Sequence, residues 1–312
     1  MRGARLATIV AFALLTAYGV LTARETCADL LYFWGPKAVR FAAAGGIDLA
    51  FLKAPEHFLM HPDYPPLVPL AYAWAAMLAG GFSYWGPLLL TALLLGLTAL
   101  LVPGRGGVLM AALLAFGYAQ ALAAGAADPM LIFFEVAALS ALTFLDAPLL
   151  ASIALAGAAM TKVEGAAFAV VAIVAYAIVS RRPLRAIGIA VTPAILLGSS
   201  IAFARMHGMI DSYARGTTPL VWSPEALGAI VRSASYHAYY LPWLAVLLPI
   251  ALAKQLKRAA LPLLVAAGSL AYIVFFYMHA DANLEFWIAV SAERVLLTPL
   301  AALAVAAAAA SE

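Results

Sequence analysis

The sequence predicts an all-α polytopic membrane protein, with about ten transmembrane helices and short surface-lying helices in its first outer loop. Of its 312 residues, 66% are hydrophobic and only 11% are charged. Several apolar runs approach the length of about 20 residues that spans roughly 30 Å of hydrocarbon. These runs are continuous rather than alternating, which indicates helices, because lipid offers the backbone no hydrogen-bond partner.

Ten apolar runs are predicted to cross the membrane: residues 6–22, 84–102, 107–125, 129–145, 148–161, 163–180, 186–204, 236–253, 259–278 and 292–310. Arg2 and Arg5 precede the first run, as in a secretory signal, but its long apolar core favours an uncleaved span. The run 66–79 reaches only about 21 Å and is expected to lie half in the membrane or on its surface. We therefore expect one membrane domain over residues 1–312, with outer loops at 23–83 and 205–235. The alanine run 301–310 is expected to end the last helix without a chemical role.

Loop charge predicts the orientation. With both termini in the cytoplasm and 66–79 not crossing, every loop obeys the positive-inside rule. The basic residues placed inside are Arg2, Arg5, Arg105, Arg181, Arg182, Arg185, Lys254, Lys257 and Arg258, against the acids Asp146 and Glu312. Compact loops and alanine-rich composition favour a bacterial inner (plasma) membrane.

Composition also excludes several classes of partner and site. The net charge is only +3, and no basic cluster is interleaved with aromatic residues, so nucleic acid is not expected as a partner. The single cysteine, Cys27, excludes a disulfide framework within one chain and a cysteine-based metal cluster.

The first outer segment contains the stretch DLLYFWGPKAVRF. Pro36 suits the first turn of a helix. Four residues then follow the helical spacing i, i+3, i+4 and i+7, namely Trp34, Lys37, Ala38 and Phe41. This predicts an amphipathic helix in the membrane interface, with aromatic anchors and with Lys37 and Arg40 near the lipid phosphates. Asp29, just before it, is either a solvated turn residue or part of a site.

The stretch HPDYPPL places a carboxylate at the start of an apolar segment. Pro65 and Pro66 keep the chain extended, so that Asp63 is presented at the bilayer surface. It is expected there either as a ligand of acceptor or sugar hydroxyls beside Asp29, or as a charge that complements a helix dipole. His61 and Tyr64 are candidate substrate-binding residues beside it. A divalent metal at Glu56, His57, His61 and Asp63 is a weaker alternative, because Pro62 and Pro65 oppose a helix through His61. No metal or other cofactor is assigned.

Four further candidates lie near the outer ends of predicted spans. Asp128 precedes Pro129 and is either functional or a helix N-terminus. Lys162 and Glu164 lie between two spans; the lysine is a phosphate ligand or a snorkelling residue paired with its neighbour. Arg294 is a second phosphate candidate.

Two weaker candidates accompany these four. Glu135, two turns after Asp128, faces a cavity or pairs with another span. The loop 205–235 offers a possible acceptor surface at Arg205, Tyr213, Arg215 and Trp222.

Five fragments in this order resemble one family: DLLYFWGPKA, HPDYPPLVPL, GAADPMLIFF, TKVEG and SAERVLLTPL. The sequence is similar to class C membrane glycosyltransferases, in the branch of polyprenyl-phosphate-sugar dependent mannosyl, aminoarabinosyl and galacturonosyl transferases. The resemblance implies an inverting transfer of sugar on the non-cytoplasmic face, with Asp29 as general base. Substrate would be bound by Lys37, His61, Asp63, Tyr64, Asp128, Lys162, Glu164 and Arg294. Val163 and Glu293 depart from the family pattern.

The implied partners are a polyprenyl-phosphate sugar donor, membrane lipids and a glycan, lipid or protein acceptor. The alternative function is a transporter or flippase of lipid-linked sugars. Such a protein needs charges or broken helices near the membrane midplane, where this sequence has only Glu135 and some prolines. A structural membrane subunit would leave the outer carboxylates unexplained.

Overall fold

The structure, a computed structural model, describes residues 2–22, 28–117, 125–209, 224–236, 241–253, 256–278 and 284–311. Within these ranges all regular structure is helical and there is no strand. The predicted all-α fold class is therefore confirmed.

Each of the ten predicted spans overlaps a helix. These helices are α1 (Arg2–Thr22), α5 (Trp85–Leu100), α6 (Arg105–Gly117), α8 (Asp128–Thr143), α9 (Pro148–Thr161), α10 (Val163–Ser180), α11 (Pro183–Met206), α13 (Leu241–Ala253), α14 (Leu256–Met278) and α16 (Leu297–Ser311). Among the described residues, α10, α11 and α14 are long and apolar enough to cross a membrane, by length and composition. This supports a membrane protein, while the number of ten crossings stays a prediction.

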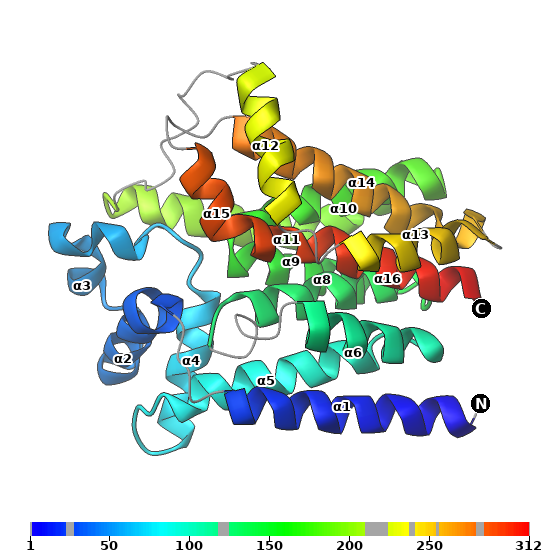
Figure 1. Cartoon of the computed structure of the whole chain (residues 1–312). Helices are drawn as coiled ribbons and strands as arrows, with labels where there is room; N and C mark the ends of the chain where they lie inside the picture. Colours follow the sequence, from blue (N-terminus) through cyan, green and yellow to red (C-terminus); the bar gives the residue numbers. More distant parts are fainter. Residues whose placement is uncertain are drawn as a thin grey trace.

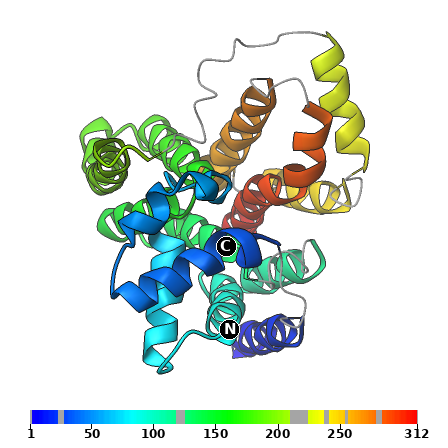
Figure 2. The same ribbon diagram turned by 90° about the vertical axis from the view of Figure 1, so that its left-hand side faces the viewer.

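The expected surface helices form a separate group at one end of the molecule. They are the π-helical segment η1 (Leu30–Trp34), α2 (Gly35–Ala44), α3 (Leu49–Lys53), the 3₁₀ segment η2 (Pro55–Met60) and α4 (Leu67–Leu78). The start of α1 and the end of α16 lie together at the opposite end (Figure 1). Figure 2 looks at the end that carries α2, which lies in front of the long helices.

The last helix, α16, lies in the middle of the bundle rather than at its edge. Every residue from Pro299 to Ala310 is buried, against α6, α8, α13 and α14. Small side chains allow this close approach, because a Cβ on Gly106 would overlap the Cβ of Ala308. The alanine run therefore has a structural role that its composition alone did not reveal.

Two segments expected as loops contain helices. The outer loop 205–235 includes all but the last residue of α12 (Pro224–Tyr236), and the connection between the predicted spans 259–278 and 292–310 includes the start of α15 (Leu284–Val295). The last predicted span is interrupted at Leu296, between α15 and α16. Ile288 and Ala292 of α15 are buried in a small apolar cluster with residues of α14, which explains why this segment is helical.

The amphipathic helix at Lys37 forms as predicted, but its apolar face points elsewhere. Trp34, Lys37, Ala38 and Phe41 are all buried, in a cluster that includes residues of α4. The expectation that these aromatics anchor the chain among lipid headgroups was therefore wrong. Their burial against protein is the more favourable arrangement because α4 supplies a second apolar face.

Candidate active site

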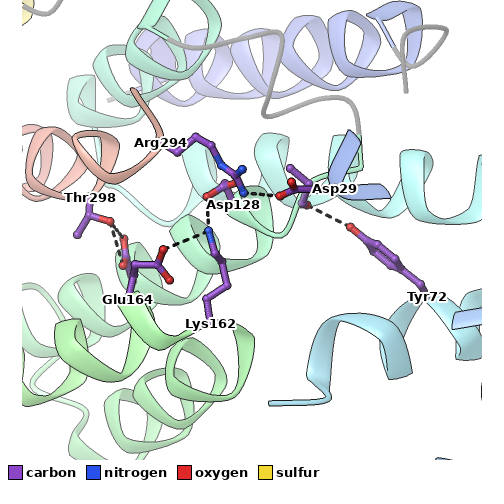
Figure 3. A network of polar contacts seen from close by, with 9 residues as sticks. Asp29, Tyr72, Asp128, Lys162, Glu164, Arg294 and Thr298 are labelled. Atoms are coloured by element: carbon purple, nitrogen blue, oxygen red, sulfur yellow. Dashed lines mark hydrogen bonds and ion pairs between the residues drawn. The ribbon is translucent and has the colours of Figure 1, made fainter. Parts of the chain in front are cut away.

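Asp29 begins the helical segment that leads into α2. It precedes η1, whose wide π-helical turn ends at Gly35, where the backbone N–H donates to the carbonyl of Leu30. A Cβ on Gly35 would overlap that carbonyl oxygen, so the turn requires glycine here. The carboxylate of Asp29 does not cap the helix. It is directed instead to Arg294, near the end of α15 (Figure 3).

Arg294 joins two carboxylates from distant parts of the chain. Its Nη2 donates to Oδ2 of Asp29, its Nε donates to Oδ2 of Asp128 at 2.9 Å, and Nη2 lies 2.8 Å from that same Asp128 oxygen. Asp128 begins α8 and its side chain is 4% exposed, whereas those of Asp29 and Arg294 are each 20% exposed. Asp128 thus lies behind a more accessible pair.

Lys162 completes this cluster from the turn between α9 and α10. Its backbone is extended, and its Nζ lies 3.2 Å from Oδ1 of Asp128 and 3.5 Å from Oε1 of Glu164. Burial acts to lower the pKa of Lys162, but the carboxylates of Asp128 and Glu164 outweigh it and hold the pKa above its ordinary value. The lysine is therefore a charged member of the cluster. The more exposed members are Asp29, Arg294 and Glu164.

Glu135 provides a second contact between α8 and the end of the chain. It is 1% exposed, and its two carboxylate oxygens lie 3.1 and 2.9 Å from the hydroxyl of Thr298 on α16. This pairing with another helix is the structural alternative that its position in an apolar run left open.

Two residues that support the cluster were missed from the sequence. Tyr72 of α4 is fully buried and donates to the carbonyls of Gly125 and Ala126 at 3.0 and 3.1 Å, which fixes the turn before Asp128. Thr298 is the other. Both are polar side chains within apolar helices, which is the feature of the sequence that could have indicated their role. Tyrosine and threonine are too common in such helices for this feature to identify these two residues.

A second group surrounds Lys37. Its Nζ donates to the carbonyl of His61 at 2.8 Å and lies 5.2 and 5.9 Å from the ring centres of Trp34 and Tyr64. His61 is stacked on Tyr64 at 4.6 Å, and its φ of 50° turns the chain sharply after η2. The predicted substrate ligands Lys37, His61 and Tyr64 are thus neighbours.

Lys37 and Asp63 line a small, partly open cavity that encloses about 20 Å³, room for about one water molecule. Its other walls include Tyr64 and, from the end of α11, Phe203 and Ala204. Burial lowers the pKa of Lys37 from 10.5 to about 7, and the negative charge of Asp63 opposes this shift. The cavity therefore combines apolar walls with a buried amine and a carboxylate.

The nine predicted site residues fall into two groups of contacts. The first contains Asp29, Asp128, Lys162, Glu164 and Arg294, and the second contains Lys37, His61, Asp63 and Tyr64. The segment from Asp29 to Lys37 joins them, since residues 28–44 are continuously helical. Asp63 was expected beside Asp29, but it lines the cavity with Lys37 instead.

The helical geometry required by the metal alternative is not formed. His57 lies in η2, where its Nδ1 donates to the carbonyl of Phe51 at 2.7 Å, and His61 follows outside that helix. Within the described ranges no three His, Cys, Asp or Glu side chains are grouped to hold a metal ion. Cys27, Tyr213, Arg215 and Trp222 lie outside the residues that the structure describes.

Comparison with known proteins found no matching protein-family model, no matching curated protein and no matching solved structure.

Proposed function

We propose that the protein is a membrane glycosyltransferase, which moves a sugar from a polyprenyl-phosphate carrier to an acceptor hydroxyl with inversion, and that Asp29 is its general base. The observation that carries this proposal is the setting of the Asp29 carboxylate. Oδ2 is held by Arg294, whereas Oδ1 has no hydrogen-bond partner among the described residues, and the side chain is partly exposed. A carboxylate held at one oxygen and open at the other is suited to accept a proton from a bound hydroxyl.

The charges around Asp29 support a transfer that releases a phosphate. As the bond from the sugar C1 to the phosphate oxygen breaks, negative charge grows on the phosphate, and nearby cations stabilise it. Arg294 and Lys162 are already opposed by three carboxylates, those of Asp29, Asp128 and Glu164. They can stabilise a phosphate only in part.

Lys37 is the better amine for the carrier phosphate, because the negative charge of a bound phosphate would favour the protonated amine, whose pKa burial lowers to about 7. It is 2% exposed, and its Nζ donates to a carbonyl, which carries no net charge. Its cavity reaches the end of α11, a helix long and apolar enough to span the membrane. An isoprenoid headgroup could reach the mouth of this cavity from the lipid, where Tyr64 lines the wall beside Lys37.

The proposed orientation follows loop charge. Both termini and Arg105 face the cytoplasm of a bacterial inner membrane, ten helices cross it, and the site faces outward. A cysteine introduced at position 105, in a chain whose Cys27 is replaced by serine, should resist a membrane-impermeant thiol reagent added outside intact cells. Ready labelling would contradict the orientation.

Transfer of label tests the activity. The purified protein should transfer sugar from a radiolabelled polyprenyl-phosphate donor to acceptors in a membrane extract, and Asp29→Asn should lower the rate about 10²–10⁴-fold. Asp146→Asn is the matched control, because it breaks another carboxylate–guanidinium pair, with Arg185, that is largely exposed. Wild-type protein without product, or an Asp29→Asn variant with full rate, would refute the proposal.

The same preparation separates the alternative function. In liposomes, a flippase would move the labelled lipid between leaflets without forming a glycosidic product. The transferase should form product in detergent, where no leaflets exist.

A further inference from the structure

We propose that Asp128 is a positioning residue, which holds Arg294 and Lys162 in place and, through Arg294, orients the general base Asp29 without touching the substrate. This inference rests on the proposed function and changes the role of Asp128 from the substrate ligand that its sequence context predicted.

Burial separates Asp128 from the residues that a substrate can reach. Its side chain is 4% exposed, against 20% for both Asp29 and Arg294. Both of its carboxylate oxygens are occupied, Oδ1 by Nζ of Lys162 and Oδ2 by Nε and Nη2 of Arg294. A bound sugar or phosphate would have to displace a cation to reach it.

The contacts of Arg294 make Asp29 depend on Asp128. On one edge of the guanidinium, Nε donates to Oδ2 of Asp128 and Nη2 lies 2.8 Å from the same oxygen, which fixes the plane of the group. One of these nitrogens, Nη2, also donates to Asp29. Loss of the Asp128 charge would release Arg294, and the carboxylate of Asp29 would lose its defined orientation.

The surrounding chain fixes Asp128 from two sides. The turn that precedes it is held by Tyr72, through the carbonyls of Gly125 and Ala126. Seven residues later on the same helix, Glu135 contacts Thr298 of α16. Asp128 and Glu135 therefore join α8 to α15 and α16 at two levels, which keeps Arg294 in register with Asp128.

A double-mutant cycle on turnover tests the inference. We expect Asp128→Asn to lower kcat about 10²-fold, the loss that follows small misplacement of catalytic groups. We expect the KM for the labelled donor to stay within about threefold, because no substrate contact is lost. In an Arg294→Gln background the same substitution should lower kcat by less than about fivefold, because its main route to Asp29 is already broken.

Asp128→Asn leaves two buried cations without their shared carboxylate, so its folding is checked separately. Thermal unfolding should show a Tm lowered by roughly 5–20 °C. When both cations are also removed, in an Arg294→Gln/Lys162→Met background, Asp128→Asn should lower the Tm by less than about 3 °C. This second cycle tests whether Asp128 holds Arg294 and Lys162 even where turnover is too slow to measure. Asp146→Asn serves as the control. It should change neither kcat nor the coupling in kcat between Asp128→Asn and Arg294→Gln.

The outcomes distinguish this inference from the proposed function. Multiplicative losses of kcat for Asp128→Asn and Arg294→Gln, or a donor KM that rises with the loss of Asp128, would overturn the positioning role while leaving the transferase intact. Wild-type protein without product would refute the transferase, and the unfolding cycle would then still test whether Asp128 holds both cations. Equal Tm losses in both backgrounds would overturn that.

Discussion

The buried amine of Lys37 predicts how the stability of the protein depends on pH. Its pKa is about 7 in the folded protein, against an ordinary value of 10.5. Between these values the unfolded chain binds the proton that the folded protein has released, so stability rises with pH. The full difference of three to four pKa units corresponds to about 5 kcal/mol, of which about 3 kcal/mol is gained between about pH 6.5 and pH 9.5.

Comparison with Lys37→Met isolates this contribution. Methionine fills the same space without a titrating group, so the pH-dependent part of the difference between the two proteins belongs to Lys37. We expect the Tm of the wild type to rise by roughly 6–12 °C relative to Lys37→Met over that pH range, as 1 kcal/mol shifts the Tm by roughly 2–4 °C. The lost hydrogen bond to His61 lowers stability by the same amount at every pH.

The assay is thermal unfolding in detergent, followed by intrinsic tryptophan fluorescence at several pH values. Lys37→Arg is the matched control, because its side chain stays charged throughout and should show no pH-dependent gain, at a lower Tm than Lys37→Met. A difference between wild type and Lys37→Met that stays constant, or that falls as pH rises, would refute the buried amine.

Three further predictions concern the supports of the first group. Tyr72→Phe removes the donor to two buried carbonyls and should lower stability by about 1–3 kcal/mol, measured by thermal unfolding; an unchanged Tm would show that water replaces the hydroxyl. Thr298→Val should lower stability by about 1–3 kcal/mol, because Glu135 loses the donor it has, and a Glu135→Leu/Thr298→Val double variant should recover part of that loss. Gly125→Ala should lower stability by about 1–3 kcal/mol, because φ is +82° there and the added Cβ would overlap the side chain of Leu30; wild-type stability would contradict that close approach.

Much of the helical architecture could be predicted from the sequence. The bounds of α9 and α10 match the predicted runs, because apolar composition defines each span and Pro148 and Lys162 mark its start or end. The division of the last span at Leu296 was not predicted, although Pro299 has no N–H to donate to the carbonyl of Val295 and therefore opposes a continuous helix. The contacts of α15 with α12 and α14, which no spacing in the sequence reveals, accompany this interruption.

The sequence could predict which residues belong to the candidate site, but not which of them lie together. Charged residues in an apolar chain are few, so Asp29, Asp128, Lys162 and Arg294 could be selected from sequence. That Lys37 and Asp63 line a separate cavity depends on how α2, α4 and α11 pack, which no spacing encodes. Likewise, the face of α2 that carries Lys37 looks the same in sequence whether lipid or protein covers it.

The contact between Asp29 and Arg294 joins residues 265 positions apart. During synthesis the carboxylate of Asp29 leaves the ribosome long before its guanidinium partner exists. The cluster around Arg294 can therefore be completed only after the intervening helices have been made.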